Sequence, residues 1–252
     1  MRVVVFCEAA ADFRTATDII DRVVRAMCPA WVGDLLDSTP ETVRTWHHDP
    51  DGRPFFDLHD HDKYRRDLGV RPRHGHFDGA PNMPGALMAS SVFRIVRALR
   101  RIEPALDGVV LMWDLDQQPD ERRRGVAQAV TDALSWADFA IVVGLPCRMR
   151  EAWVVAGFVP ADDEEQARLA DLRRELGFSP VEESHQLDAQ DESAKRSAKR
   201  VVTVLTQGDP DREARCWQEP LLETLEARGS NNGLASFLEA VRTRLVPLAV
   251  RE

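Results

Sequence analysis

The sequence has few cysteines and no apolar run long enough to cross a membrane. Its cysteines, Cys7, Cys28, Cys147 and Cys216, are scattered, and none forms a CxxC pair or has a histidine at metal-ligand spacing. This distribution is typical of reduced thiols, so we expect a cytoplasmic protein. The longest apolar runs, such as 139–146, have strand length and fall short of the roughly 18 residues of a spanning helix, so no membrane association is expected.

The sequence also has no excess of basic residues. The chain has 33 Lys and Arg against 42 Asp and Glu in 252 residues, a formal net charge of −9. Tight, unaided binding of nucleic acid is disfavoured, because such proteins usually present a basic surface. An acidic cluster that holds metal ions would contribute to the same negative charge. The length suits one large α/β domain, or a smaller domain with an appendage.

Alternating strands and helices are predicted in the first part of the chain. Continuous apolar runs predict buried strands at 2–7, 108–113 and 138–144. Apolar residues at helical spacing predict helices at 12–28, 87–101 and 119–136, with Asp12 as a cap of the first. Such an alternation predicts a parallel sheet covered on both faces. We therefore expect an α/β core over 1–160.

The core is expected to end with a helix at 149–157. The remainder, 161–252, is predicted to be helical and to pack on this core, with helices at 162–176, 192–205, 219–228 and from Asn231 or Asn232 onward. Within the core, residues 47–85 do not fit the alternation, because they are rich in Gly, Pro, Asp and His. They predict a long loop or insertion. A transition-metal site at His59-Asp60-His61-Asp62 is one interpretation of this segment, and a polar loop is the other.

Acidic residues directly follow two predicted strands. Glu8 follows the first strand, and Asp114 and Asp116 follow the second. Ligands of open parallel sheets bind outside the carboxyl ends of the strands. Carboxylates placed side by side repel one another unless a cation neutralises them, and oxygen ligands suit Mg²⁺ or Mn²⁺. The pattern predicts a metal site led by these acids, with Asp12 either a further ligand or a helix cap.

The order of these motifs resembles the Toprim family. Glu8 and Asp12 in EAAAD, followed by a strand that ends in Asp114-Leu-Asp116, are similar to the Toprim pattern. Glu151-Ala-Trp153 and the segment 231–241 resemble the acidic helix start and the last helix of small Toprim-like proteins of bacterial and phage-defence loci. These include nucleases of the overcoming-lysogenization-defect type.

The resemblance implies a Toprim-like fold and a metal-dependent endonuclease of anti-phage defence. In that interpretation Glu8 is a general acid/base or metal ligand, and Asp114 and Asp116 bind Mg²⁺ or Mn²⁺. Glu151 would support a second ion, as in two-metal phosphodiester hydrolysis. The substrate would be nucleic acid, with DNA favoured over RNA. An ATPase partner is implied, and a homo-oligomer is compatible with the pattern.

Basic side chains in two segments are candidates for nucleic-acid contacts. The segment 47–85 contains Arg65, Arg66, Arg71 and Arg73, which would follow a phosphate backbone. Lys195 and Lys199 lie four residues apart on a predicted helix. They predict either a phosphate clamp, with Lys195 as a catalytic lysine like that of some of these nucleases, or a solvated helix face.

Two other functions are compatible with the same residues. A haloacid-dehalogenase-like phosphatase also has a strand that ends in DLD, but on its first strand, and Glu8 would then have no role. A Toprim-like interaction or sensor subunit without catalysis is favoured by the net acidity and by Ala9, which stands where the family usually has glycine. Retention of the whole acid cluster argues against that second alternative.

Overall fold

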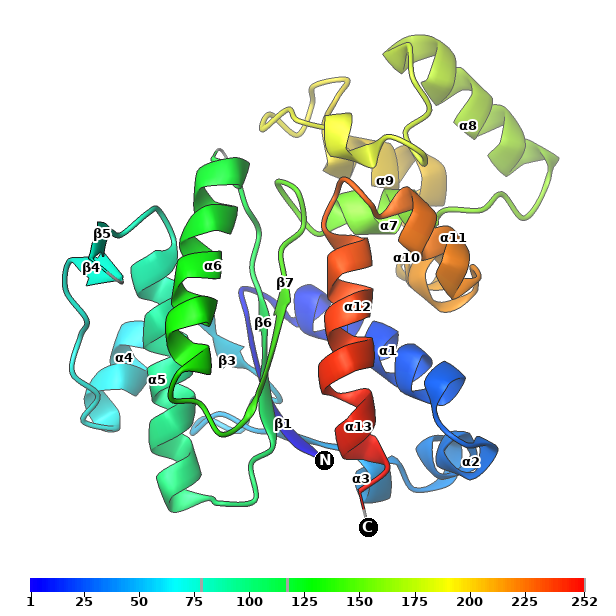
Figure 1. The fold of residues 1–252 in the computed structure, drawn as a ribbon. Coiled ribbons are helices and arrows are strands. Elements are labelled where there is room, and N and C mark those ends of the chain that lie inside the picture. The colour runs from blue at the N-terminus through cyan, green and yellow to red at the C-terminus, as the bar shows by residue number, and fades with distance from the viewer. Residues whose placement is uncertain (78, 117, 252) are drawn as a thin grey trace. The chain divides into compact units, whose positions relative to one another are not determined.

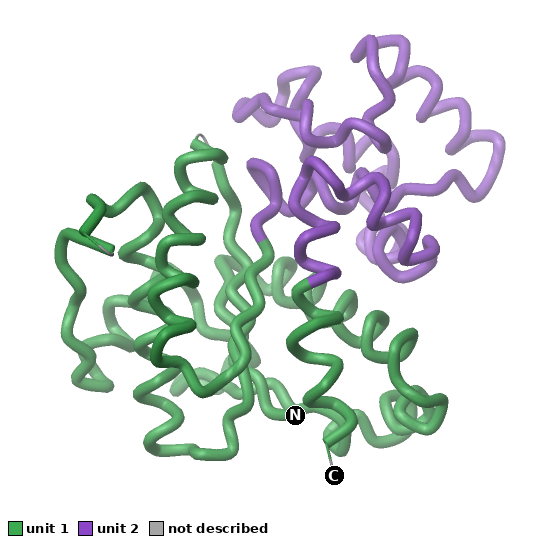
Figure 2. Tube along the Cα trace, in the orientation of Figure 1, with its two compact units in different colours: residues 1–144, 240–252 green, residues 145–239 purple. Residues whose placement is uncertain are grey.

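The computed structural model describes residues 1–77, 79–116 and 118–251 and divides into two compact units (Figure 2). The first unit contains Met1–Gly144 and Ala240–Glu252, and the second contains Leu145–Glu239. We expected the core to continue to residue 160 and residues 161–252 to form a helical part that packs on it. Instead the first unit ends with its last strand, and the C-terminal residues return to it.

A parallel five-stranded sheet forms the centre of the first unit, as the alternating pattern predicts (Figure 1). Its order is β2–β1–β6–β7, and β3 also pairs with β1. The strands are β1 (Arg2–Cys7), β2 (Thr45–His47), β3 (Phe56–Asp57), β6 (Gly108–Met112) and β7 (Ala140–Gly144). Val3 of β1 is aligned with Gly108, and Phe6 with Leu111, so β1 and β6 end at the same edge. The predicted α/β class is confirmed.

Helices cover the sheet of the first unit. The long ones are α1 (Ala10–Met27), α5 (Ala86–Ile102) and α6 (Pro119–Leu134). In Figure 1, α5 and α6 lie side by side, whereas α1 lies on the other side of the sheet with α13 (Val246–Ala249). The inward side chains of α1 and α5, such as Ile19 and Phe93, are fully buried. Each contributes about 1.5–3 kcal/mol through removal of apolar surface from water.

The segment 47–85 is not the loop that its composition predicts. After the short helices α2 (Ala30–Ser38) and α3 (Pro40–Val43) and strand β2, the chain forms β3 and then α4 (His61–Asp67). A small antiparallel pair follows, β4 (His76–Phe77) with β5 (Ala80–Pro81). Of the two alternatives for this segment, the long loop was therefore wrong, because part of the segment belongs to the sheet.

A polar network explains why this segment is ordered. The guanidinium of Arg53 donates to Asp49 at 2.7 Å, to Asp60 at 2.9 Å and to the Tyr64 hydroxyl at 2.9 Å. The Tyr64 hydroxyl in turn donates to Asp49 at 3.0 Å. The ring of Tyr64 packs 4.8 Å from the ring of Phe56 on β3. Polar residues that suggest a loop in the sequence are thus partners of one another, and buried polar groups require such partners.

The second unit is helical. It contains α7 (Glu151–Gly157), α8 (Asp163–Leu176), α9 (Ala198–Thr206), α10 (Pro210–Gln218), α11 (Leu222–Arg228) and the start of α12 (Leu234–Arg244). The helix predicted at 192–205 begins only at Ala198, because the Ser197 side chain caps it by accepting from the Arg200 N–H. Helix α10 was not predicted, although Asp209 before Pro210 is a common start signal.

Buried polar contacts hold the second unit together. Arg212 donates to both oxygens of Glu165, at 2.6 and 2.7 Å, and this ion pair lowers the pKa of Glu165 to about 2. Asn232 is fully buried, its side-chain oxygen accepts from the Leu234 N–H at 3.0 Å, and its carbonyl accepts from the Trp153 indole at 2.9 Å. Asn232, one of the two predicted caps, therefore starts the last long helix.

The four cysteines all lie in the described part of the chain and form no disulfide there, and Cys7 and Cys216 are buried. Burial raises the pKa of both thiols, which keeps them protonated near neutral pH. None of the helices in the described part of the chain combines the length and the apolar character needed to cross a membrane.

Replacement of Gly125 by alanine tests the close approach of α6 to the start of α5. A Cβ atom at Gly125 would lie 1.9 Å from the Pro84 carbonyl oxygen, so the backbone must move. We expect Gly125→Ala to lower the free energy of unfolding by about 1–3 kcal/mol.

In the control Gly33→Ala, the new Cβ meets only the flexible Arg25 side chain at 3.4 Å. It should be neutral or stabilising by about 0.5–1 kcal/mol, because alanine favours helix more than glycine does. The denaturant midpoints of the two variants measure these changes in stability. Equal effects of the two substitutions would contradict a close approach of α6 to the chain before α5.

Candidate active site

Acidic residues at the ends of three neighbouring strands lie at one edge of the sheet. Glu8 follows β1 directly, Asp57 ends β3, and Asp114 and Asp116 follow β6. Strand β1 pairs with both others, since Cys7 is aligned with Asp57 and Phe6 with Leu111. We call these residues, Glu8, Asp57, Asp114 and Asp116, the acidic edge. It lies where open parallel sheets generally place their ligands.

Glu8 is the member of the acidic edge whose protonation is most affected. Its side chain is half-buried, and this burial raises the pKa of the Glu8 carboxyl. The negative charges of Asp116 and Asp12 raise it further, whereas His59 and Arg122 oppose the rise. The structure thus brings Glu8 within electrostatic reach of Asp116 and Asp12, as the sequence predicts. A carboxyl with a raised pKa is suited to giving and taking protons.

Arg122 neutralises part of the acidic edge. From the first turn of α6 its guanidinium donates to the Asp114 carbonyl oxygen at 2.6 Å and to the Asp116 carboxylate at 2.7 Å. The guanidinium carbon also lies 4.7 Å from the centre of the Trp113 ring. Asp116 has a φ of 46°, in the left-handed region. We infer that these contacts offset the cost of that backbone conformation.

A glycine makes room for this arginine. Gly85, at the start of α5, has a φ of 84°. A Cβ atom at Gly85 would lie 2.9 Å from the Cγ atom of Arg122 and 3.2 Å from the Trp113 ring. The positive φ and the close approach both favour glycine at this position. The start of α5 therefore supports the placement of Arg122 against the acidic edge.

Asp12 has a structural role at the start of α1. The helix begins at Ala10 rather than at residue 12, and its N-cap is Ala9. Asp12 is buried, and its carboxylate accepts a hydrogen bond from the Ala9 N–H at 3.0 Å. The predicted N-cap position of Asp12 was wrong by one turn, although its carboxylate does satisfy a backbone donor of this helix end. Its negative charge still acts on Glu8.

Asp57 and His59 were not predicted as a pair, and they extend the acidic edge. The Asp57 carboxylate accepts from the His59 backbone N–H at 2.9 Å and lies 2.9 Å from Nδ1 of the same ring. This hydrogen bond raises the pKa of His59, and the charge of Glu8 adds to the rise. His59 is exposed, so its proton can exchange with solvent. The strand β3, hidden in the predicted loop, is what brings this pair to the site.

A metal ion at the acidic edge fits only in part. Within residues 1–77, 79–116 and 118–251, no group of three or more His, Cys, Asp or Glu side chains is placed to hold one. The same finding gives no support to the alternative of a transition-metal site at 59–62 within these residues. Mg²⁺, however, commonly uses one or two carboxylates together with water and substrate phosphates. The carboxylate repulsion on Glu8 fits such a partly formed site.

Three predicted site residues belong to the second unit. Glu151 lies at the start of α7, and one of its oxygens is 3.4 Å from the guanidinium of Arg150. Lys195 and Lys199 were predicted to share a helix face, but Lys195 lies in a turn before α9, so that prediction was wrong. Lys199 is on α9 and donates to Glu192 at 2.7 Å. Lys195 is exposed.

The arginines predicted to contact nucleic acid differ in their surroundings. Arg65 donates to Asp62 at 3.0 Å, and Arg73 is paired with Asp132 and covers the Phe77 ring at 4.1 Å. These two arginines stabilise the local fold. Arg66 and Arg71 are exposed, and neither has an ion pair within the described part of the chain.

Comparisons with known proteins were made at three levels. No family model matches the chain, no curated protein matches it, and no solved structure matches it. The chemistry of the acidic edge must therefore be inferred from its own side chains.

Removal of the Arg122 charge should change the titration of Glu8. Because Arg122 lowers the pKa of Glu8, we expect Arg122→Gln to raise that pKa. The same substitution should lower the free energy of unfolding by about 1 kcal/mol, because charge-assisted hydrogen bonds are lost. The measurement is the carboxyl-carbon NMR shift of Glu8 against pH. Arg123→Gln is the matched control, since Arg123 is exposed and pairs with Asp120 at 3.3 Å. Equal shifts in both variants would contradict the role given to Arg122.

Neutralisation of Glu8 should stabilise the protein at high pH. A folded-state pKa above the ordinary value of 4.5 means that stability is fully present below pH 4.5 and is lost as pH rises through the folded pKa. We therefore expect Glu8→Gln to raise the melting temperature more at pH 8 than at pH 4. Glu41→Gln, an exposed acid on α3, is the control and should show no such difference. A pH-independent effect of Glu8→Gln would argue against the crowding of negative charge at this edge.

Proposed function

We propose that this chain is a metal-dependent nuclease that hydrolyses phosphodiester bonds of nucleic acid, with the acidic edge as its active site. The observation that supports this most directly is the placement of Glu8, with a raised pKa, among the acids that follow β1, β3 and β6. The resemblance of the same residues to the Toprim pattern also supports it. A cytoplasmic role in bacterial anti-phage defence, with an ATPase partner that captures DNA, belongs to this proposal.

Glu8 would move protons in the reaction. A water molecule attacks phosphorus, its proton passes to the ionised Glu8 carboxylate, and the bond from phosphorus to the leaving sugar oxygen breaks. The leaving oxygen then takes a proton from Glu8 or from the protonated ring of His59. Burial and neighbouring acids bring the pKa of Glu8 closer to neutral pH, where both directions of transfer are efficient.

Arg122 would position the substrate in this scheme. A guanidinium offers paired donors that match phosphate oxygens, and Arg122 already presents its donors at the acidic edge. A bound Mg²⁺ or Mn²⁺ would supply polarisation of a phosphoryl oxygen and a more acidic water. Glu8, Asp114 and Asp116 are the residues of the described chain that would hold it. Glu151 is not needed for this first ion.

One observation favours a second function, that of a Toprim-like interaction or sensor subunit without catalysis. Arg122 pairs with Asp116 at 2.7 Å and thus occupies a carboxylate that the nuclease would offer to a metal. An internal cation of this kind neutralises Asp116 without any metal ion. The same edge would then bind a partner's basic group or a phosphate rather than cleave.

A cleavage assay separates these functions. Plasmid, linear duplex, single-stranded DNA and RNA are incubated with the wild type in Mg²⁺, Mn²⁺ or EDTA, alone and with the ATPase partner. We expect cleavage that EDTA abolishes and that Glu8→Gln and Asp114→Asn each reduce by at least about 100-fold. Asp120→Asn is the control, because Asp120 is an exposed acid of the same region that pairs with Arg123.

The outcomes are distinct. Loss of cleavage in the two site variants but not in the control supports the nuclease. Metal-dependent cleavage that survives Glu8→Gln would place the chemistry elsewhere. Absence of cleavage by the wild type under every condition would favour the inactive subunit.

A further inference from the structure

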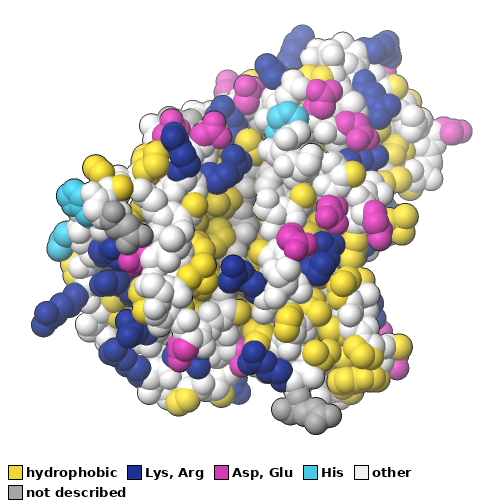
Figure 3. All heavy atoms as spheres, viewed as in Figure 1, with side chains coloured by type: hydrophobic (Ala, Val, Ile, Leu, Met, Phe, Trp, Pro, Cys, Tyr) yellow, Lys and Arg dark blue, Asp and Glu magenta, His cyan; other side chains and the backbone are white. Residues whose placement is uncertain are grey.

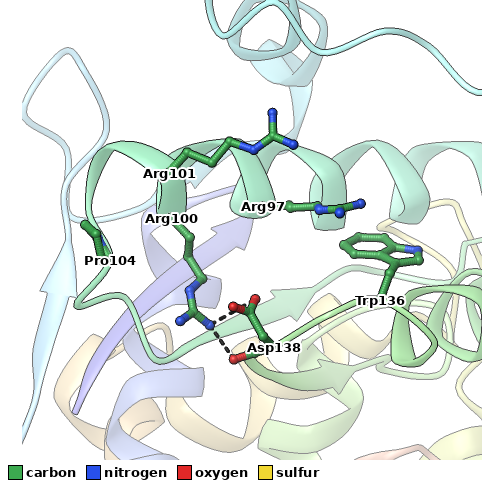
Figure 4. A pocket seen from close by; sticks show the side chains of 6 residues that line it. All are labelled: Arg97, Arg100, Arg101, Pro104, Trp136 and Asp138. Carbon is green, nitrogen blue, oxygen red and sulfur yellow. Dashed lines mark hydrogen bonds and ion pairs between the residues drawn. The ribbon is translucent and has the colours of Figure 1, made fainter.

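Two adjoining hollows lie along the exposed face of α5, away from the acidic edge. One, of about 430 Å³, is lined by Arg97, Arg100, Arg101, Pro104, Trp136 and Asp138 (Figure 4). The other, of about 240 Å³, shares Arg97 and Arg101 with it and adds Arg71, Arg94 and the turn 68–70. Figure 3 shows basic side chains gathered on the side of the molecule where α4 and α5 lie in Figure 1. We call Arg71, Arg94, Arg97, Arg101 and Trp136 the arginine groove.

Among the residues that the structure describes, no acid neutralises the positive charge of the groove. Within the described residues, none of its arginines forms an ion pair with Asp or Glu; the only arginine pair of these hollows is that of Arg100 with Asp138, at 3.2 Å. Arg71, Arg97 and Arg101 are exposed and Arg94 is half-exposed. In a chain with a net charge of −9, such a concentration of unpaired cations requires an explanation.

Two of the guanidinium groups, those of Arg94 and Arg97, are held in place before any ligand binds. The Arg97 guanidinium lies over the Trp136 ring, 5.1 Å from its centre, and Figure 4 shows this stacking. Arg94 donates to the Arg71 carbonyl oxygen at 3.4 Å, which ties the turn after α4 to α5. Residues 94, 97 and 101 share one face of the helix through their spacing of three and four. Fixed donors lose less entropy on binding than mobile ones.

Helix α5 connects this groove to the acidic edge. Its first residues adjoin Gly85, which packs against Arg122. Its last turn adjoins Pro104 and Asp138, which precede β6 and β7 and therefore lie at the opposite edge of the sheet. A helix of 17 residues spans about 25 Å. A polyanion that lies along α5 can therefore reach both places.

We propose that the arginine groove binds the phosphate backbone of nucleic acid and guides it along α5 to the acidic edge. This proposal rests on the proposed function for the choice of ligand. The chemistry favours it, because planar guanidinium groups match phosphate oxygens and stack on bases. A recessed groove fits a ridge of phosphates better than the flat surface of an anionic membrane, which amphipathic helices bind through inserted apolar side chains.

The test measures binding without cleavage. A short fluorescent DNA strand and its duplex are titrated with full-length protein in EDTA at several salt concentrations, and anisotropy reports binding. We expect Arg97→Gln combined with Arg101→Gln to weaken binding at least about tenfold. It should also lower the slope of log K against log salt for the duplex by about 2, since each phosphate contact contributes about 0.9. Arg173→Gln combined with Arg174→Gln, on α8, changes the net charge equally and should leave the slope unchanged.

Each outcome decides the proposal. A loss of binding and of salt slope in Arg97→Gln with Arg101→Gln, but not in Arg173→Gln with Arg174→Gln, supports the groove as a nucleic-acid site. This result does not depend on cleavage, so the groove proposal and the nuclease proposal can fail separately. Equal weakening by both variants, or no binding by the wild type at low salt, overturns it. Preferential binding to phosphatidylserine vesicles that is lost in the groove variant would also overturn it in favour of a membrane surface. If the double variant does not fold, Arg71→Gln, on an exposed turn, should lower the slope by about 1.

Discussion

Negative charge gathers at one edge of the sheet because every strand of a parallel sheet ends there. Glu8, Asp57, Asp114 and Asp116 are brought to that edge by the pairing of β1 with β3 and β6. Much of the surrounding structure offsets their repulsion. Arg122 bonds to Asp116, and His59 bonds to Asp57. Glu8 remains half-buried without a comparable partner among the described residues, and burial together with the neighbouring acids raises its pKa.

The fold supports this edge through close backbone approaches. Gly125 lets α6 touch the chain before α5, and Gly85 leaves space for Arg122. Arg53 holds β3 and the following turn in place through several acids and Tyr64. These residues lie outside any short motif, yet they determine where the acids of the motif are held. The acidic edge is therefore a property of the first unit as a whole.

Charge is divided unevenly within the first unit. The acidic edge and the arginine groove lie at opposite edges of the sheet, and α5 runs between them. A net charge of −9 hides this division, because a sum over the chain carries no information about position. The division suits a protein that holds a polyanion with one surface and acts on it with another, which the proposed nuclease and the proposed groove require together.

The sequence by itself determined the α/β class, the three long strands and the placement of Glu8, Asp114 and Asp116 at strand ends. Continuous apolar runs and strand-end acids are local signals, so they can be read without a structure. Only the tertiary structure decided the roles of Asp57, His59, Arg53 and Arg122, and the position of Lys195 in a turn. The strand β3 has two residues and no pattern of its own, and it forms because β1 offers an unpaired edge. Contacts between residues distant in the chain produce no periodic pattern in the sequence, so these roles could not be predicted from it.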